Sequence, residues 1–254
     1  SDVCSSDLFP DAAAVGLAVP GFVDPQSGRI AGLPNVPGVE DADLARPLER
    51  VLELPVVVEN DALAAAWGAF QRHPERPLDL IFLGLGTGVG GGVILDGRPY
   101  RGRHGYAMEV GHIVVEPGGR ACGCGGRGCL ERYASASGVS LDYQEATGDE
   151  LPARDIAVRA RDGDREAAAA FSRAGEHLAG VVATLMKTLD VTHVVVGGGM
   201  AAAWDLMAEA FDARLDEDVL GVQRHLLHLS VDDSGDEIGM VGAALLGRLR
   251  ESDG

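Results

Sequence analysis

Three cysteines and a histidine in the middle of the chain constrain its folding more than any other feature. Cys122, Cys124 and Cys129 fall within eight positions, His112 precedes them, and the only other cysteine of the 254 residues is Cys4. Zinc prefers thiolate and imidazole ligands in a tetrahedral shell, and the intervening glycines let the backbone wrap around one ion. The spacing therefore predicts a Cys3His zinc site, which leaves no open coordination position and is structural.

Two other interpretations of the cysteine cluster are a disulfide pair and three buried free thiols. A disulfide leaves one thiol of the cluster over, and nothing else in the sequence indicates a secreted protein. The sequence has no apolar run long enough to span a bilayer and no signal-peptide pattern. We therefore expect a zinc site in a soluble, cytoplasmic protein.

Two glutamates flank the expected metal ligands, Glu109 before His112 and Glu131 after Cys129. The simplest interpretation is that both are solvated surface acids, as most glutamates are. Carboxylates also accept hydrogen bonds from paired hydroxyls, and a zinc knot would tie the two ends of this loop together. Segment 109–131 therefore predicts a polar lining for a small polyol pocket.

The pattern Glu-x-Gly-His at 109–112, followed by Cys-x-Cys-Gly-x2-Gly-Cys-x-Glu at 122–131, resembles the signature of the ROK family, the bacterial sugar kinases and sugar-responsive repressors. The resemblance implies an α/β fold of the actin-like ATPase (ribonuclease H-like) type with two lobes. It implies that the Cys3His cluster holds zinc, and that Glu109, His112 and Glu131 contact sugar hydroxyls.

Apolar runs and turn residues alternate along the chain in the manner of an α/β protein. The expected strands are 15–19, 56–58, 81–85, 89–95 and 193–196, with the first two buried. The expected helices follow Asp61, run over 164–189 and close the chain over about 238–249. The helix after Asp61 should present one apolar face, formed by Leu63, Trp67 and Phe70. The longest helix should present another, formed by Phe171, Leu178, Val182 and Leu185.

Asp61 stands in the sequence Glu59-Asn60-Asp61, where an expected strand gives way to a helix. The simplest interpretation is a helix N-cap, because asparagine and aspartate both favour that position. The resemblance to the ROK kinase motif implies instead that Asp61 is the catalytic base and that Asn60 hydrogen-bonds the sugar. A base in that role orients the attacking hydroxyl and accepts its proton. Leu63 departs from the asparagine often found there in the family, and we expect it to serve packing.

Two glycine-rich turns are candidate nucleotide contacts, since glycines let backbone amides approach anionic oxygens closely. The first comprises Gly86, Thr87, Gly88 and Gly90, and it resembles a phosphate motif of the family. The second comprises Gly197, Gly198 and Gly199, and it resembles the adenosine motif of the actin-like ATPase fold. Both also suit purely conformational turns, and neither is a P-loop, because no Gly-Lys-Ser/Thr follows. The resemblance implies Mg-ATP as the nucleotide.

The Asp-x-Gly-Gly-Thr motif with which ROK kinases begin is absent from the start of this sequence. Residues 1–8 have no counterpart in the family, and we expect them to be a foreign leader. Residues 9–79 are then the remnant of an incomplete small N-terminal lobe. Residues 80–254 form the large C-terminal lobe with the zinc loop 109–131, while the last helix packs on the small lobe.

The formal net charge of −18 disfavours a phosphate-backbone partner, so we expect no nucleic-acid binding by this chain. Arg98, Arg101 and Arg103 form the densest basic patch. Without interleaved aromatic side chains they predict a solvated loop. The family resemblance also implies a homodimer, which the residue pattern itself does not indicate.

Two classes of function remain. The first is an ATP-dependent hexose kinase, foremost a glucokinase that converts glucose to glucose 6-phosphate, with N-acetylhexosamine or N-acetylmannosamine kinases as variants. The second is the sugar-sensing domain of a ROK repressor, which would use the same pocket and zinc loop as a switch. Asp61 and the turn at 86–88 favour the kinase.

Overall fold

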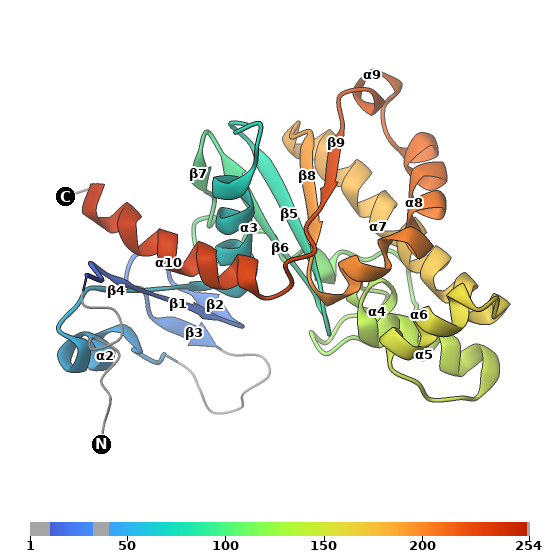
Figure 1. Cartoon of the computed structure of the whole chain (residues 1–254), viewed down its shortest axis with the longest axis horizontal. Helices are drawn as coiled ribbons and strands as arrows, with labels where there is room; N and C mark the ends of the chain where they lie inside the picture. The colour runs from blue at the N-terminus through green and yellow to red at the C-terminus, as the bar shows by residue number, and fades with distance from the viewer. Residues whose placement is uncertain (1–10, 33–40, 253–254) are drawn as a thin grey trace. The chain divides into compact units, whose positions relative to one another are not determined.

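The computed structural model describes residues 11–32 and 41–252, and the chain divides into two compact units (Figure 1). The first unit contains the described residues of Ser1–Leu78, Gly92–Met108 and Asp236–Gly254. The second contains Asp79–Gly91 and Glu109–Gly235. The expected leader 1–8 lies outside the described residues. The second unit starts beside the lobe boundary expected at 79–80, whereas Gly92–Met108 and the C-terminal helix belong to the first.

The first unit is built on two pairs of strands. β1 (Val15–Val19) runs parallel to β4 (Val56–Asn60), and β2 (Phe22–Val23) pairs antiparallel with β3 (Ile30–Gly32). α2 (Ala45–Leu52) precedes β4. The core is formed by Val19, Val23, Ile30, Val56 and Val58. β4 is largely buried as expected, but most of β1 is only half-buried, so the expectation of a fully buried first strand is wrong.

Two helices of the first unit pack with their backbones close together. α3 (Asp61–Arg72) follows β4 directly, and α10 (Glu237–Ser252) packs across it (Figure 1). A Cβ on Gly68 would lie 2.2 Å from the Ile238 carbonyl oxygen, and one on Gly242 would lie 1.7 Å from that of Ala64. Only glycine therefore permits this approach. Leu63, at 6% exposure, packs in the core as expected.

The second unit contains a parallel sheet. β5 (Leu80–Leu85), β8 (His193–Gly197) and β9 (His228–Val231) are parallel neighbours, and Gly84 stands opposite Gly197. The complete strand order is β7-β6-β5-β8-β9. β6 (Val89–Leu95) carries the chain from the second unit into the first, where it turns through Asp96 and Gly97 into β7 (Arg98–Pro99). The strands expected at 81–85, 89–95 and 193–196 are confirmed within one residue at each end.

Helices cover the remainder of the second unit. α7 (Arg165–Leu189) starts where Asp164 accepts hydrogen bonds from two backbone amides, and it ends at Asp190 in the left-handed conformation. Its four predicted core side chains are buried, which confirms the apolar stripe. Around it pack α4 (Glu131–Ala134), α5 (Ala136–Thr147), α6 (Ala153–Arg161) and α8 (Trp204–Asp218). The short elements η1 (Val110–His112), η2 (Gly199–Ala203) and α9 (Gly221–Arg224) complete the unit.

Among the described residues, no helix has both the length and the apolar character that crossing a membrane requires.

Candidate functional site

Asn60 lies at the corner where β4 ends and α3 begins. Its Oδ1 accepts a hydrogen bond from the Leu63 amide at 3.0 Å, and its Nδ2 donates to the Gly21 carbonyl at 3.1 Å. The N-cap interpretation is therefore confirmed for Asn60. A carboxamide offers two donors and two acceptor lone pairs, so each end of the side chain keeps capacity for one further hydrogen bond.

Asp61 is the first residue of α3 and is exposed. Its Oδ1 accepts a hydrogen bond from the Ala62 amide at 2.8 Å. The protein around the carboxyl partly desolvates it and raises its pKa above the ordinary value, and the Ala62 hydrogen bond offsets this only in part. A carboxylate with a raised pKa is a stronger base than an ordinary surface aspartate, which suits the predicted role of proton acceptor.

Glu59, the residue before Asn60, is buried and paired with a distant arginine. Its Oε2 lies 2.6 Å from Nε of Arg101, and 6% of the Glu59 side chain is exposed. The expectation that the basic patch at 98–103 forms a solvated loop is therefore wrong for Arg101, because a buried carboxylate requires a paired charge. The two residues are 42 positions apart, so no local spacing in the sequence indicates the pair.

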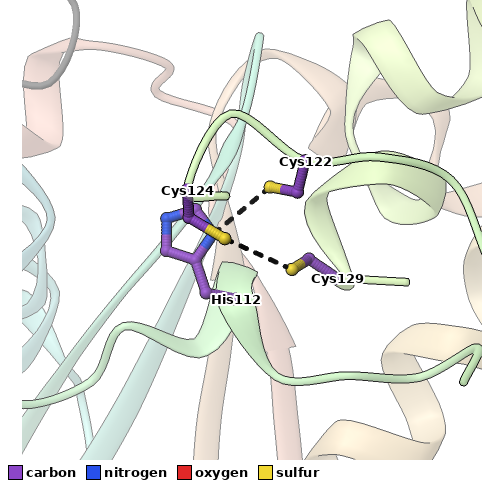
Figure 2. A group of neighbouring side chains, drawn as sticks. All are labelled: His112, Cys122, Cys124 and Cys129. Carbon is purple, nitrogen blue, oxygen red and sulfur yellow. Dashed lines mark hydrogen bonds between the residues drawn. The ribbon is translucent and has the colours of Figure 1, made fainter. Parts of the chain in front are cut away.

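The predicted zinc ligands converge in the second unit (Figure 2). Nδ1 of His112 lies 3.6 Å from Sγ of Cys122, and Sγ of Cys124 lies 3.6 Å from Sγ of Cys129. All four ligand atoms lie within 4.8 Å of one another. A tetrahedral zinc shell with Zn–S bonds near 2.3 Å places neighbouring ligand atoms about 3.6–3.8 Å apart. The cluster therefore has the composition and the spacing of a closed zinc site.

The thiols of the cluster differ in their electrostatic surroundings. Desolvation raises the pKa of Cys129 to about 12, whereas a hydrogen bond from the Gly126 amide lowers the pKa of Cys124. Zinc binds thiolates and displaces the thiol protons. Ionisation of the buried Cys129 sulfur therefore depends more on a bound cation than ionisation of Cys124 does.

His112 connects the metal cluster to Glu109. While Nδ1 faces the Cys122 sulfur, Nε2 lies 3.7 Å from the Glu109 carboxylate. Metal-bound histidines commonly direct the second ring nitrogen at a carboxylate, which fixes the orientation of the ring. The 3.7 Å separation exceeds a direct hydrogen bond.

Glu131 connects the zinc loop to the first glycine-rich turn. It is the first residue of α4, and its Oε2 accepts a hydrogen bond from the Val89 amide at 3.3 Å. Ser137 donates its hydroxyl to the Thr87 carbonyl at 2.8 Å, and the Ala136 amide donates to the Gly86 carbonyl at 2.9 Å. The start of α5 and Glu131 thus hold this turn in place within the second unit.

The turn at 86–88 leaves backbone donors available. The Gly86 amide donates to the Gly88 carbonyl at 2.9 Å. Within the part of the chain that the structure describes, the amides of Thr87 and Gly88 have no hydrogen-bond partner, and Thr87 is exposed. Successive free amides in a turn form a concave site for anionic oxygens. Gly90 instead lies inside β6 and does not belong to the turn.

The second glycine-rich turn lies beside the first. Gly197 ends β8 opposite Gly84 of β5, and Gly198 follows with φ of 86°. A Cβ on Gly198 would lie 2.5 Å from the Leu85 carbonyl oxygen, so this position admits only glycine. Both turns therefore meet at the carboxyl ends of adjacent parallel strands, where α/β sheets bind ligands.

Arg120 gives the zinc loop a second anchor that does not involve metal. Its guanidinium donates to the Asp142 carboxylate and, at 2.5 Å, to Glu145, both on α5. Its backbone amide donates to the Tyr133 hydroxyl at 2.9 Å. Sequence analysis missed this residue, because an arginine inside a glycine-rich loop carries no signal of its distant partners.

The family profile and the curated relatives that match this chain agree with each other. The ROK family profile matches residues 5–249. The N-acetylmannosamine kinase of Escherichia coli O1:K1 is 34% identical over 248 residues, which cover 95% of this chain and 81% of that protein.

Solved structures extend the likeness to two kinds of protein. A ROK family glucokinase from Streptomyces griseus, in complex with glucose and AMPPNP, is 33% identical with a TM-score of 0.81, covering 94% of this chain and 82% of that chain. A ROK family transcriptional regulator, a homologue of the E. coli MLC protein, is 28% identical with a TM-score of 0.84. The latter match covers 93% of this chain and 62% of the regulator.

Proposed function

The chain belongs to the ROK family, and we propose that it is an ATP-dependent sugar kinase that phosphorylates a hexose. Its α/β fold is of the actin-like ATPase type, as its solved relatives and the family match indicate. The observation that carries the proposal is the hydrogen bond between Glu131 and the Val89 amide. This hydrogen bond supports the proposal, because it joins Glu131, a proposed sugar contact, to the residue that follows the proposed phosphate turn at 86–88.

Asp61 is the proposed general base. Its exposed carboxylate, with a raised pKa, accepts the proton of the attacking sugar hydroxyl as the phosphoryl group is transferred. Asn60 contributes a hydrogen bond to the same sugar through the capacity left on its carboxamide. These assignments follow from the resemblance of Glu59-Asn60-Asp61 to the family motif, and the local geometry of the β4–α3 corner supports them.

Glu109, His112 and Glu131 are the proposed sugar contacts of the second unit. Two carboxylates and an imidazole provide acceptors and a donor that match the hydroxyls of a pyranose ring. Zinc on the Cys3His cluster is structural in this proposal: it cross-links the loop and fixes the His112 ring through Nδ1. The ring's Nε2 then stays directed toward Glu109 and the sugar.

Mg-ATP is the proposed phosphoryl donor. The free amides of Thr87 and Gly88, with the Thr87 hydroxyl, face the phosphates, and the turn at Gly197–Gly199 lies beside the adenosine. Backbone amides suit this role, because they are fixed donors that need no side-chain reorganisation.

Glucose is the first substrate that we propose, on the strength of the glucose-bound relative at 33% identity. N-acetylmannosamine is the alternative, supported by curated relatives at 34% identity. The two sugars differ at few pocket contacts, so turnover of both at equal concentration decides between them. A sugar-sensing role is favoured by the regulator's TM-score of 0.84, and sugar binding without turnover would support it.

The test is ATP-dependent phosphorylation measured with the wild-type chain and with Asp61→Asn. We expect the substitution to abolish turnover while leaving sugar affinity nearly unchanged, because the shape of the pocket is kept. Asp212→Asn, on the exposed face of α8, is the matched control and should keep wild-type turnover. Full activity of Asp61→Asn would refute the assignment of the base.

A further inference from the structure

Glu59 is a buried carboxylate two positions from an exposed one. Its side chain is 6% exposed, whereas Asp61 is exposed. An unpaired carboxylate is too costly to bury, so a partner must fix the position of this one. That partner is Arg101, whose Nε lies 2.6 Å from Oε2 in a short, charge-assisted contact. The Glu59 carboxylate therefore has one defined position in the first unit.

The same carboxylate fixes the backbone from which α3 starts. Its Oε1 accepts a hydrogen bond from the Asn60 amide at 3.0 Å. The Asn60 side chain in turn holds the Leu63 amide and the Gly21 carbonyl. Asp61 thus follows a residue that is held at three points, and the hydrogen bond from the Ala62 amide orients its carboxylate from there.

Arg101 is itself held in place by the segment around it. Its carbonyl accepts a hydrogen bond from the Ala107 amide at 3.3 Å. Gly105 lies so near the strand pair β2–β3 that a Cβ on it would be 2.1 Å from the Val23 carbonyl oxygen. The turn that carries the guanidinium to Glu59 is therefore anchored on the first unit, and it is not a loose surface loop.

We propose that Glu59 and Arg101 are positioning residues that hold the β4–α3 corner so that the Asp61 carboxylate meets the attacking hydroxyl. This inference rests on the kinase function proposed above. Neither residue is assigned a contact with substrate. A displacement of a reacting group by 1 Å can cost on the order of 100-fold in rate, so loss of the ion pair should act on catalysis more than on binding.

The experiment compares Arg101→Gln, Arg101→Lys and Glu59→Gln with the double variant Glu59→Gln/Arg101→Gln. Arg103→Gln, which is exposed on the same turn, is the matched control. For each variant, kcat and the KM for sugar and for ATP are measured, and kcat is normalised to the folded fraction from circular dichroism. The double variant covers the case in which Arg101→Gln fails to fold, because it leaves no unpaired buried charge.

We expect kcat per folded molecule to fall roughly 10- to 100-fold in Arg101→Gln and in the double variant, with less than about threefold change in either KM. Arg101→Lys, which keeps the charge, should recover part of the loss, and Arg103→Gln should stay within about twofold of wild type. The two single losses should not add in the double variant, because both substitutions break one contact.

The outcomes separate the inference from the function on which it rests. Suppose that the wild type is active and Asp61→Asn is inactive. An unchanged kcat in the folded double variant would then overturn the positioning role alone, even if the Tm of that variant fell. A wild type that phosphorylates no sugar would overturn the kinase assignment and this inference with it.

Discussion

The carboxylate of Asp61 lies where the surrounding protein disfavours a negative charge, and the proposed reaction requires a carboxylate at this position. The raised pKa is caused mainly by desolvation of the carboxyl. Below the ordinary value of 3.8 the side chain is neutral in both folded and unfolded protein and costs no stability. Between pH 3.8 and the folded-state pKa, Asp61 is ionised in the unfolded chain but still largely protonated in the folded protein. The free energy of unfolding therefore falls as pH rises through this range, and it changes no further above the folded-state pKa.

Asp61→Asn should therefore be more stable than wild type at neutral pH, although we expect it to be inactive. We expect a rise in Tm on the order of 1–2 °C at pH 7, small because solvent screens an exposed group. The gain should shrink as pH falls toward 3.8, where the aspartate is protonated in both states. Thermal unfolding followed by circular dichroism from pH 4 to pH 8 measures it. A lower Tm than wild type at pH 7 would contradict the desolvation argument.

At the residue scale, sequence patterns predicted side chains that belong to motifs and missed those that act through distant partners. Asn60 was predictable as a cap because N-capping depends on residues three positions apart. The convergence of His112 with the three cysteines was predictable because zinc sites have close ligand spacing. The pairing of Glu59 with Arg101 depends on how β4 packs against the turn after β7, and no local pattern encodes that contact.

At the scale of elements, the Cys3His cluster and Arg120 attach different parts of the zinc loop. His112 and the three cysteines gather at its tip, where zinc is proposed to bind, and Arg120 ties its base to α5. Structural zinc contributes on the order of 10 kcal/mol to local folding. The loop should consequently lose its tip geometry without metal while its base stays on the helix.

Cys124→Ser should release zinc and weaken sugar binding, because the His112 ring loses its fixed orientation toward Glu109. We expect metal content to fall from about one zinc per chain to near zero, and sugar affinity to fall by roughly 10-fold or more. Elemental analysis and isothermal titration with the sugar measure both. Cys4→Ser, outside the cluster, is the control. A verified zinc-free variant with unchanged sugar affinity would refute the coupling.

Helices and strands that have a clear local sequence pattern were predicted from the sequence, and a strand with only a short pattern was missed. α7 has an aspartate cap and a buried apolar stripe, and both were predictable. β9 was missed because its four residues are mainly exposed, although Leu229 and Val231 alternate with His228 and Ser230. It is a strand because β8 supplies the hydrogen bonds, with His228 opposite His193.

At the scale of the whole molecule, the excess of 39 acidic over 21 basic residues makes the folded chain repel itself. Raising ionic strength from about 10 mM to 200 mM shortens the Debye length from roughly 30 Å to below 10 Å. We expect a stabilisation of about 1 kcal/mol, or roughly 2–4 °C in Tm at pH 7. The salt effect should disappear near the isoelectric point of about 4.6. A Tm at pH 7 that falls with salt would mean that surface ion pairs outweigh the repulsion.

The division of the chain into units follows contacts that local patterns do not report. Gly92 lies against α3, where a Cβ would be 2.5 Å from the Ala66 side chain. This approach places the second half of β6 and the turn after it in the first unit. The strand itself was predictable from its apolar residues, but its passage from one unit to the other was not.

The packing of α10 on α3 has a consequence for synthesis on the ribosome. Gly68 lies against the carbonyl of Ile238, a residue that is synthesised roughly 170 positions later. At 5–20 residues per second, Gly68 therefore leaves the exit tunnel about 10–30 s before Ile238 does. During this time α10 does not yet cover the surfaces of β1, β4 and α3 that it contacts in the folded unit. The first unit is therefore a natural client for chaperones that hold emerging chains, whereas Asp79–Gly91 and Glu109–Gly235 have all emerged before α10 does.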